Sequence, residues 1–138
     1  MTVSVSSGKA TVTLHPDRGG RIGSFEVDGL ELLVTAGDRP TDWGCYVMAP
    51  FAGRIRNGCF SFKGIEHQLP RNMAPHAIHG TVFDRPWSVD EIDTDRVVLS
   101  SDLGPDWPFA GRVTHEVVVT NNSLAPQIPI GGTLEPLA

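Results

Sequence analysis

Two histidines, His76 and His79, lie three positions apart in the stretch HAIHG, and His67 precedes them on the same segment. Three imidazole nitrogens could ligate zinc or non-haem iron. However, two histidines three apart on a strand or loop do not face one point as they can on a helix. No acidic ligand accompanies them at a recognisable spacing. The spacing therefore predicts no metal site, although a metal-binding barrel stays open as an alternative.

The segment between residues 49 and 87 holds the densest group of reactive side chains, among them Arg54, Arg56 and Glu66. It contains no nucleophile elbow of the G-x-S-x-G type and no Gly-rich phosphate loop. Proton transfer remains, because histidine titrates near neutral pH and can donate or accept a proton. A nearby arginine can donate a fork of hydrogen bonds to vicinal oxygens. This pairing suits a neutral polyhydroxylated ligand, although a histidine in such a loop is also commonly a structural residue.

The elements that must position these residues are short strands. Fifteen glycines and eleven prolines leave little room for long helices. The stretches between them alternate with period two, and in KATVTLH the residues Ala10, Val12 and Leu14 share one face. A later segment, GRVTHEVVVT, places four side chains on one face: Val113, His115, Val117 and Val119.

Turn signals connect these strands. Asp28-Gly29 and Lys63-Gly64 each separate two apolar runs, which predicts two hairpins. Short strands at this spacing indicate an all-β, antiparallel sandwich or barrel. We expect one domain over residues 1–123. Residues 124–138 are rich in proline and glycine, which predicts an irregular tail, because proline cannot donate to the ladder of a central strand.

Composition excludes several classes of partner. The 138 residues have a formal net charge of −5, which argues against nucleic acid and against an anionic membrane surface. The start of the chain has no signal-peptide pattern, and no apolar run has the length of a membrane span, so we predict a cytoplasmic location. In that reducing compartment Cys45 and Cys59 are expected to be small buried thiols.

The sequence resembles the aldose 1-epimerase (galactose mutarotase) family over roughly residues 18–123. The resemblance rests on four segments in order, which are GGRIGSFEVDGLELL, MAPFAGRIRNGCFSFKGIEHQLPRNMAPHAIHG, RPW and WPFAGRVTHEVVVT. It implies a large antiparallel β-sandwich. It also implies interconversion of the α and β anomers of a free aldose by acid and base groups that open and close the sugar ring, with no metal or organic cofactor.

The resemblance also assigns roles to residues. His79 matches the family's first active-site histidine, which sits against the sugar ring and supports the acid role. Arg54 matches the arginine that hydrogen-bonds sugar hydroxyls. Gly53 departs from the pattern, since the family usually has asparagine there, and His76 stands where many members have asparagine, so we assign it no catalytic role.

The chain resembles only the N-terminal portion of the family. Family members continue with strands that bring a second histidine, the usual acid, and a glutamate, the usual base. Neither matches a position in this chain, and Glu135 lies in an unrelated setting. We therefore expect an epimerase that is impaired by truncation, with an open sheet face that favours self-association. The alternatives are a non-catalytic carbohydrate-binding or regulatory module and a cupin-like barrel that binds metal through His67, His76 and His79.

Overall fold

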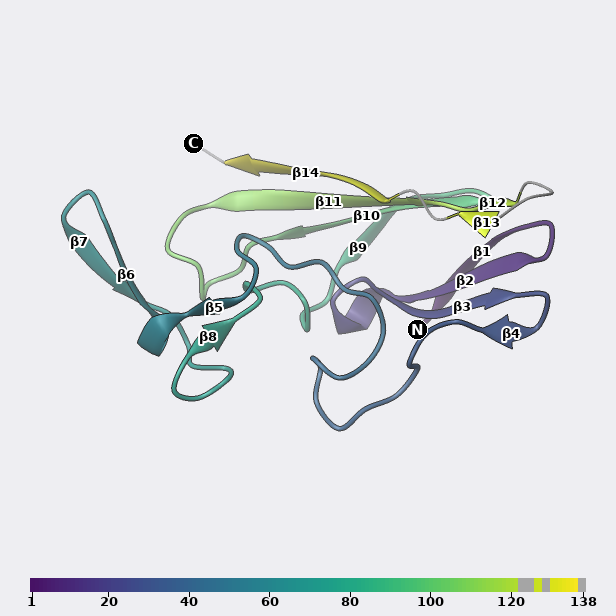
Figure 1. The fold of residues 1–138 in the computed structure, drawn as a ribbon. Helices are drawn as coiled ribbons and strands as arrows, with labels where there is room; N and C mark the ends of the chain where they lie inside the picture. Colours follow the sequence, from purple (N-terminus) through teal and green to yellow (C-terminus); the bar gives the residue numbers. More distant parts are fainter. Residues whose placement is uncertain (122–125, 128–129, 137–138) are drawn as a thin grey trace.

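Two antiparallel sheets packed face to face form the body of the computed structural model, which describes residues 1–121, 126–127 and 130–136 (Figure 1). The strand order is β1-β2-β3-β4 in one sheet and β14-β11-β10-β9 in the other. The first sheet consists of β1 (Val3–Ser7), β2 (Ala10–His15), β3 (Arg21–Val27) and β4 (Leu30–Glu31). The second consists of β9 (Ser88–Ile92), β10 (Arg96–Asp102), β11 (Gly111–Val118) and β14 (Ile130–Pro136). The predicted all-β antiparallel sandwich is confirmed.

Alternation along the strands builds the core between the two sheets. Every second residue of β2 is buried, beginning with Ala10, and the same holds for β11, beginning with Gly111. Burying one such apolar side chain contributes ~1.5–3 kcal/mol. The buried cluster takes residues from both sheets, among them Val5, Val12, Leu14, Ile22, Val97, Leu99, Val113 and Val117. The predicted inward faces of residues 10–14 and 113–119 are therefore confirmed.

Both predicted hairpins form where the turn residues can adopt a left-handed backbone. Asp28 and Gly29 have φ values of 51° and 80° between β3 and β4. Lys63 and Gly64 have φ values of 50° and 76° between β6 (Cys59–Phe62) and β7 (Ile65–Gln68). Positive φ at both central residues matches the turn to the twist of the strands.

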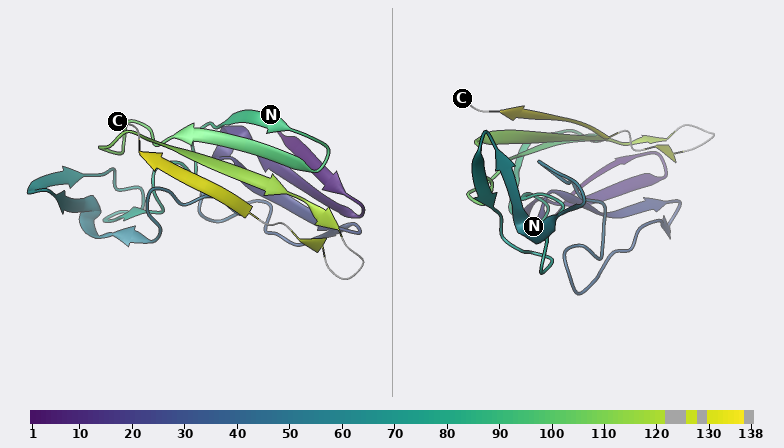
Figure 2. Two further views of the ribbon diagram at one scale, coloured as in Figure 1. Left: turned by 90° about the horizontal axis from the view of Figure 1, so that it is seen from above. Right: turned by 60° about the vertical axis from the view of Figure 1, so that its left-hand side comes forward.

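A smaller, irregular region extends beyond one end of the sandwich (Figure 2). It holds the β6–β7 hairpin and the short pair β5 (Arg54–Ile55) and β8 (Ala77–Ile78). Two single turns of 3₁₀-helix also occur, η1 (Pro16–Arg18) after β2 and η2 (Arg56–Gly58) after β5. This region carries the residues that the sequence singles out for chemistry.

The tail differs from its prediction. Residues 130–136 form β14, an edge strand that pairs with β11 along its length, and β13 (Pro126–Gln127) pairs with β12 (Thr120–Asn121). The irregular tail predicted for 124–138 was therefore wrong at these residues. The proline rule excludes central strands but leaves edge strands open, because one side of an edge has no ladder to complete. Residues 122–125, 128–129 and 137–138 lie outside the described residues, so a boundary at residue 123 stays a prediction.

Two further sequence expectations can be compared with the structure. Cys45 is exposed and Cys59 is half-buried, and neither forms a disulfide, so the expectation of buried thiols was wrong. The backbone of Cys45 pairs with Ile22 at the edge of the sandwich, which leaves the thiol outside the core. No helix in the described part of the chain is long and apolar enough to cross a bilayer.

Candidate functional site

The pairing of β5 with β8 brings Arg54 and His79 together. Arg54 lies opposite Ile78 in this pair, and His79 follows directly. The backbone N–H of His79 donates to the carbonyl oxygen of Gly53 at 2.9 Å, and the N–H of Gly53 donates to Nδ1 of His79 at 3.1 Å. Two reciprocal hydrogen bonds therefore fix both the backbone and the ring of His79 beside the arginine.

The backbone around His79 takes a conformation that most residues avoid. His79 has a φ of 61°, which is uncommon for a residue with a Cβ, and Gly80 has a φ of 81°. A Cβ at Gly80 would lie 2.0 Å from the carbonyl oxygen of Ala49, where the two segments form a parallel bridge. Glycine is therefore required after His79, and the H-G pair turns the chain while aiming the imidazole.

Two aromatic rings wall the imidazole. The ring centroids of Tyr46 and Phe83 lie 6.1 and 6.3 Å from that of His79, and they lie 5.4 Å from each other. His79 is half-buried and Arg54 is exposed. Burial lowers the pKa of His79, and the positive charge of Arg54 lowers it further, so the imidazole is neutral at pH 7.

The hydrogen bond from Gly53 determines which nitrogen of His79 carries the proton. Nδ1 accepts that bond, so in the neutral ring the proton resides on Nε2. Nε2–H is a donor, and the guanidinium of Arg54, which is near enough to lower the pKa of His79, also only donates. The arrangement can therefore present hydrogen-bond donors to the oxygens of a neutral, oxygen-rich ligand.

The aldose 1-epimerase family model matches residues 1–128. The chain belongs to the aldose 1-epimerase family. It is 34% identical over 79 residues to the protein YihR of Escherichia coli, an alignment that covers 56% of this chain and 26% of YihR.

Solved structures support the same fold. A putative aldose 1-epimerase from Escherichia coli is similar with a TM-score of 0.75 and 24% identity, covering 86% of this chain and 41% of that one. A galactose mutarotase-like protein from Lactobacillus casei gives a TM-score of 0.79 at 15% identity, with 97% and 44% covered. The chain thus spans less than half the length of these proteins, and it corresponds to the N-terminal portion of the family fold, as predicted.

His67 and His76, the other two histidines of the predicted metal-binding alternative, are held elsewhere in this epimerase-family chain. Nδ1 of His76 accepts a hydrogen bond from the backbone N–H of Asn57 at 3.1 Å. The ring of His67 stacks on that of Phe60, with ring centroids 5.1 Å apart, and meets the Phe109 ring edge-on, with centroids 5.2 Å apart. Each of the three rings thus has its own setting, and the described residues contain no group of three or more side chains placed to hold a metal ion.

A cavity of about 250 Å³ lies next to the site. Its lining includes Gly80, Phe83 and the charged residues Asp84, Arg85 and Asp106. Neither Arg54 nor His79 lines it. The donor pair and this cavity therefore share Phe83 as a wall but present separate surfaces.

Sequence reasoning missed Tyr46 and Phe83. Both lie in irregular segments, where no periodicity assigns a side chain to a face. The only available signal is composition, because Tyr46 is the single tyrosine of the chain and Phe83 follows HAIHG closely.

Proposed function

We propose that Arg54 and His79 bind a free aldose and that the chain takes part in interconverting its α and β anomers. The observation that carries the proposal is the fixed orientation of His79, whose Nδ1 is bonded by Gly53 and whose Nε2–H is left as a donor beside Arg54. Family membership supports the sugar as ligand.

The proposed chemistry divides the roles. A base takes the proton of the anomeric hydroxyl, the C1–ring oxygen bond breaks to give the aldehyde, and an acid protonates the ring oxygen. His79 donates its Nε2–H hydrogen bond to the sugar ring, where it stabilises the negative charge that develops on oxygen. Arg54 holds vicinal hydroxyls with its fork of donors. A neutral imidazole with this tautomer does not act as the base.

Sugar binding without catalysis is a second candidate, and the surroundings of His79 favour it. In the part of the chain that the structure describes, no hydrogen bond or ion pair joins its ring to a carboxylate. A non-catalytic module that binds a sugar through the same two donors is therefore the alternative.

Polarimetry on freshly dissolved α-glucose or α-galactose tests the first candidate. We expect faster relaxation than in buffer, and His79→Asn should reduce the excess rate by roughly 100-fold or more. Asparagine suits this variant because it tolerates the left-handed backbone of position 79. His76→Asn is the matched control, since it removes a histidine from the same stretch, and it should leave the rate unchanged.

Calorimetry with the same sugars separates the two candidates. Binding heat that Arg54→Gln abolishes, without any rate above buffer, would favour the binding module. If no common aldose gives binding heat or a rate above buffer, both candidates are contradicted.

A cytoplasmic location and self-association through an exposed sheet face stay predictions. The exposed side chains of Leu30, Leu32 and Val34, in and after β4, support self-association.

A further inference from the structure

Arg21 of β3 carries a guanidinium group that is completely buried, with 0% of the residue exposed. Burial lowers the pKa of Arg21 from its ordinary value, although an arginine stays protonated at any pH that the fold survives. Among the described residues it forms no ion pair, and its hydrogen bonds and ring contacts are with neutral groups, while the charges of Asp84 and Arg18 act on it from farther away. A buried charge is costly unless hydrogen bonds satisfy it, so these contacts must be strong and geometrically defined.

Its N–H groups donate to four backbone carbonyl oxygens. Nε donates to Arg18 at 2.8 Å, and Nη1 donates to Pro40 at 2.7 Å and to Trp43 at 2.9 Å. Nη2 donates to Phe83 at 2.8 Å. These carbonyls come from η1, from the long connection between β4 and β5, and from the loop after β8. One side chain of the sandwich therefore joins three segments that no strand pairing aligns.

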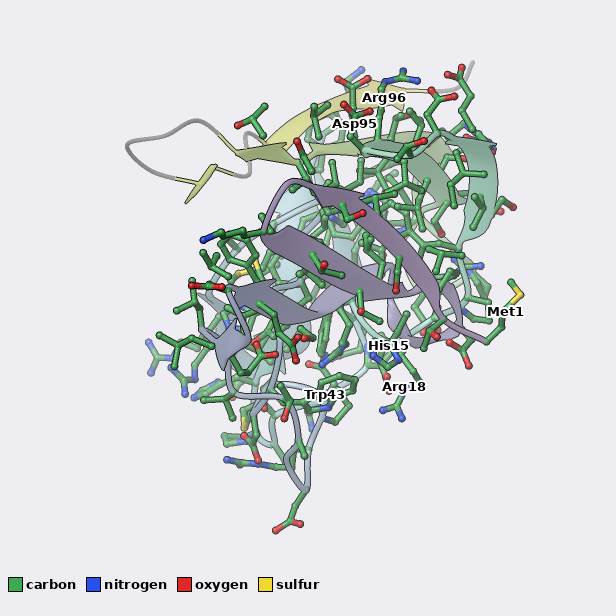
Figure 3. The ribbon with its side chains drawn as sticks, turned by 90° about the vertical axis from the view of Figure 1, so that its right-hand side faces the viewer. Met1, His15, Arg18, Trp43, Asp95 and Arg96 are labelled. Carbon is green, nitrogen blue, oxygen red and sulfur yellow. The ribbon has the colours of Figure 1, made fainter. Side chains whose placement is uncertain are left out.

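The same guanidinium lies between aromatic rings. Its central carbon is 4.4 Å from the ring centroid of Trp43 and 5.1 Å from that of Tyr46. Figure 3 shows Trp43 and Arg18 on the same side of the first sheet, next to His15. Tyr46 and Phe83 are the two residues whose rings pack against His79. Arg21 contacts Tyr46 through the face of its ring and Phe83 through its backbone carbonyl oxygen.

Two glycines allow this close approach. A Cβ at Gly19, where φ is 82°, would lie 1.9 Å from the carbonyl oxygen of Phe83. A Cβ at Gly44, where φ is 71°, would lie 2.8 Å from the carbonyl oxygen of Ile22 and 3.4 Å from Cδ of Arg21. The segments that carry Gly19 and Gly44 therefore pack so closely around Arg21 that a side chain at either glycine would clash with backbone.

We propose that Arg21 is a positioning residue for the proposed sugar site, setting the position of the His79 imidazole through the rings of Tyr46 and Phe83. It touches neither the imidazole nor any surface that a sugar could reach. A lysine cannot replace it, because an ammonium lacks the planar fork and the face that stacks on two rings. The inference rests on the proposed function for its consequence in catalysis, but the link from Arg21 to His79 can be measured without any sugar.

The test follows the His79 ring proton resonances by NMR as pH is changed. In Arg21→Lys and Arg21→Met we expect the pKa of His79 to move up toward the ordinary value of a histidine, because burial is the main cause of its depression. Val12→Ala is the matched control. It destabilises the sandwich core by a cavity and should leave the His79 titration where it is in the unaltered protein.

A pair of variants at Tyr46 tests the same link if the Arg21 variants do not fold. In the described part of the chain, the one hydrogen bond of the Tyr46 hydroxyl is donated to the carbonyl oxygen of Thr41, at 3.2 Å. Tyr46→Phe keeps the ring and should leave the His79 pKa unchanged, whereas Tyr46→Ala should raise it. An unchanged pKa in Tyr46→Ala and in every folded Arg21 variant would overturn the inference.

Sugar binding distinguishes failure of this inference from failure of the proposed function. A shifted pKa of His79 in a protein that neither binds nor converts a sugar would retain the positioning role and refute the function. Binding that survives in Arg21→Lys with an unshifted His79 would retain the function and refute the positioning role. If the chain is active, we expect kcat to fall in Arg21→Lys by a larger factor than KM rises, because a displaced His79 loses its hydrogen bond to the charge that develops on the ring oxygen while Arg54 still holds the hydroxyls.

Discussion

Two histidines in two regions of the molecule show how differently a strand and a loop treat the same side chain. His115 lies in the middle of β11 and is 3% exposed, and neither ring nitrogen has a hydrogen-bond partner among the residues that the structure describes. His79 lies after the two-residue strand β8, half-buried, with one ring nitrogen bonded to Gly53. Burial lowers the pKa of both, to about 4 for His115, whereas at His79 the charge of Arg54 contributes as well.

The difference lies in what fixes each ring. Period-two alternation sends every second residue of β11 into the core, whatever its polarity, so His115 is packed near Trp87 with ring centroids 6.3 Å apart. At His79 no alternation operates. A left-handed backbone and a reciprocal pair of hydrogen bonds aim the ring instead. An uncharged core histidine is a packing residue, and an aimed histidine is available for chemistry.

Gly80→Ala should break the loop side of this comparison most severely. The new Cβ would meet the carbonyl oxygen of Ala49 at 2.0 Å, and φ is 81°. We expect the free energy of unfolding to fall by about 4 kcal/mol or more, because backbone must move on both segments. Urea denaturation measures the loss.

Gly64→Ala is the matched control for that variant. Its φ of 76° is equally left-handed, but a Cβ there meets nothing within 4 Å. The cost should be limited to the conformational penalty of about 1–2 kcal/mol. Equal losses at the two positions would show that the close approach of Gly80 to Ala49 adds nothing to the cost of the substitution.

His115→Val tests how the buried histidine of β11 affects stability. The pKa of His115 is about 4 in the folded protein, against an ordinary value of 6.5, so between these values the unfolded chain binds more protons. Stability therefore falls as pH is lowered from about 6.5 to about 4, by about 3 kcal/mol at pH 4. At pH 7 the variant should have nearly the same free energy of unfolding as the unaltered protein, and at pH 4 it should be more stable. Urea unfolding at several pH values measures this.

Leu99→Val is the control for His115→Val, because Leu99 lies opposite His115 on β10 and is fully buried. It should lower the unfolding free energy by about 1 kcal/mol by leaving a small cavity, equally at every pH. A His115→Val variant whose stability falls with acid as steeply as that of the Leu99→Val control would show that the fold does not lower the pKa of His115.

The sandwich could be predicted because its signals are local and periodic. Ala10, Val12 and Leu14 point inward for the same reason that His115 does, and the hairpins follow from residues that adopt positive φ. The edge strand β14 could not be predicted, since its pairing with β11 is a long-range contact and its proline lies at the end of an edge.

The site could be predicted only in part. The resemblance indicates Arg54 and His79, and the structure brings them together through β5 and β8. Tyr46, Phe83 and Arg21 were not found, because they come from segments separated widely in the sequence and meet only through tertiary contacts. In addition, an arginine in an alternating strand is ordinarily assigned to the solvent face, so the sequence gives no hint that Arg21 is buried.

Gly53→Asn is the mildest change and bears on the histidine–arginine site directly. Gly53 has a φ of 75°, and a Cβ there would meet nothing within 4 Å. Asparagine tolerates this conformation better than other residues with a Cβ, so we expect a loss of stability of about 1 kcal/mol or less. The resemblance implies an asparagine here. Its amide beside Arg54 should add one hydrogen bond to a bound sugar, which would tighten the Kd several-fold by calorimetry.

Gly53→Ala separates the amide from the backbone effect. Alanine occupies the same left-handed position and costs more stability than asparagine, yet it offers no polar group. Tighter sugar binding in Gly53→Asn but not in Gly53→Ala would place the ligand against this wall. If neither variant changes the affinity of a protein that does bind sugar, then the ligand lies away from Gly53. The reciprocal hydrogen bonds between Gly53 and His79 would then serve the fold rather than the site.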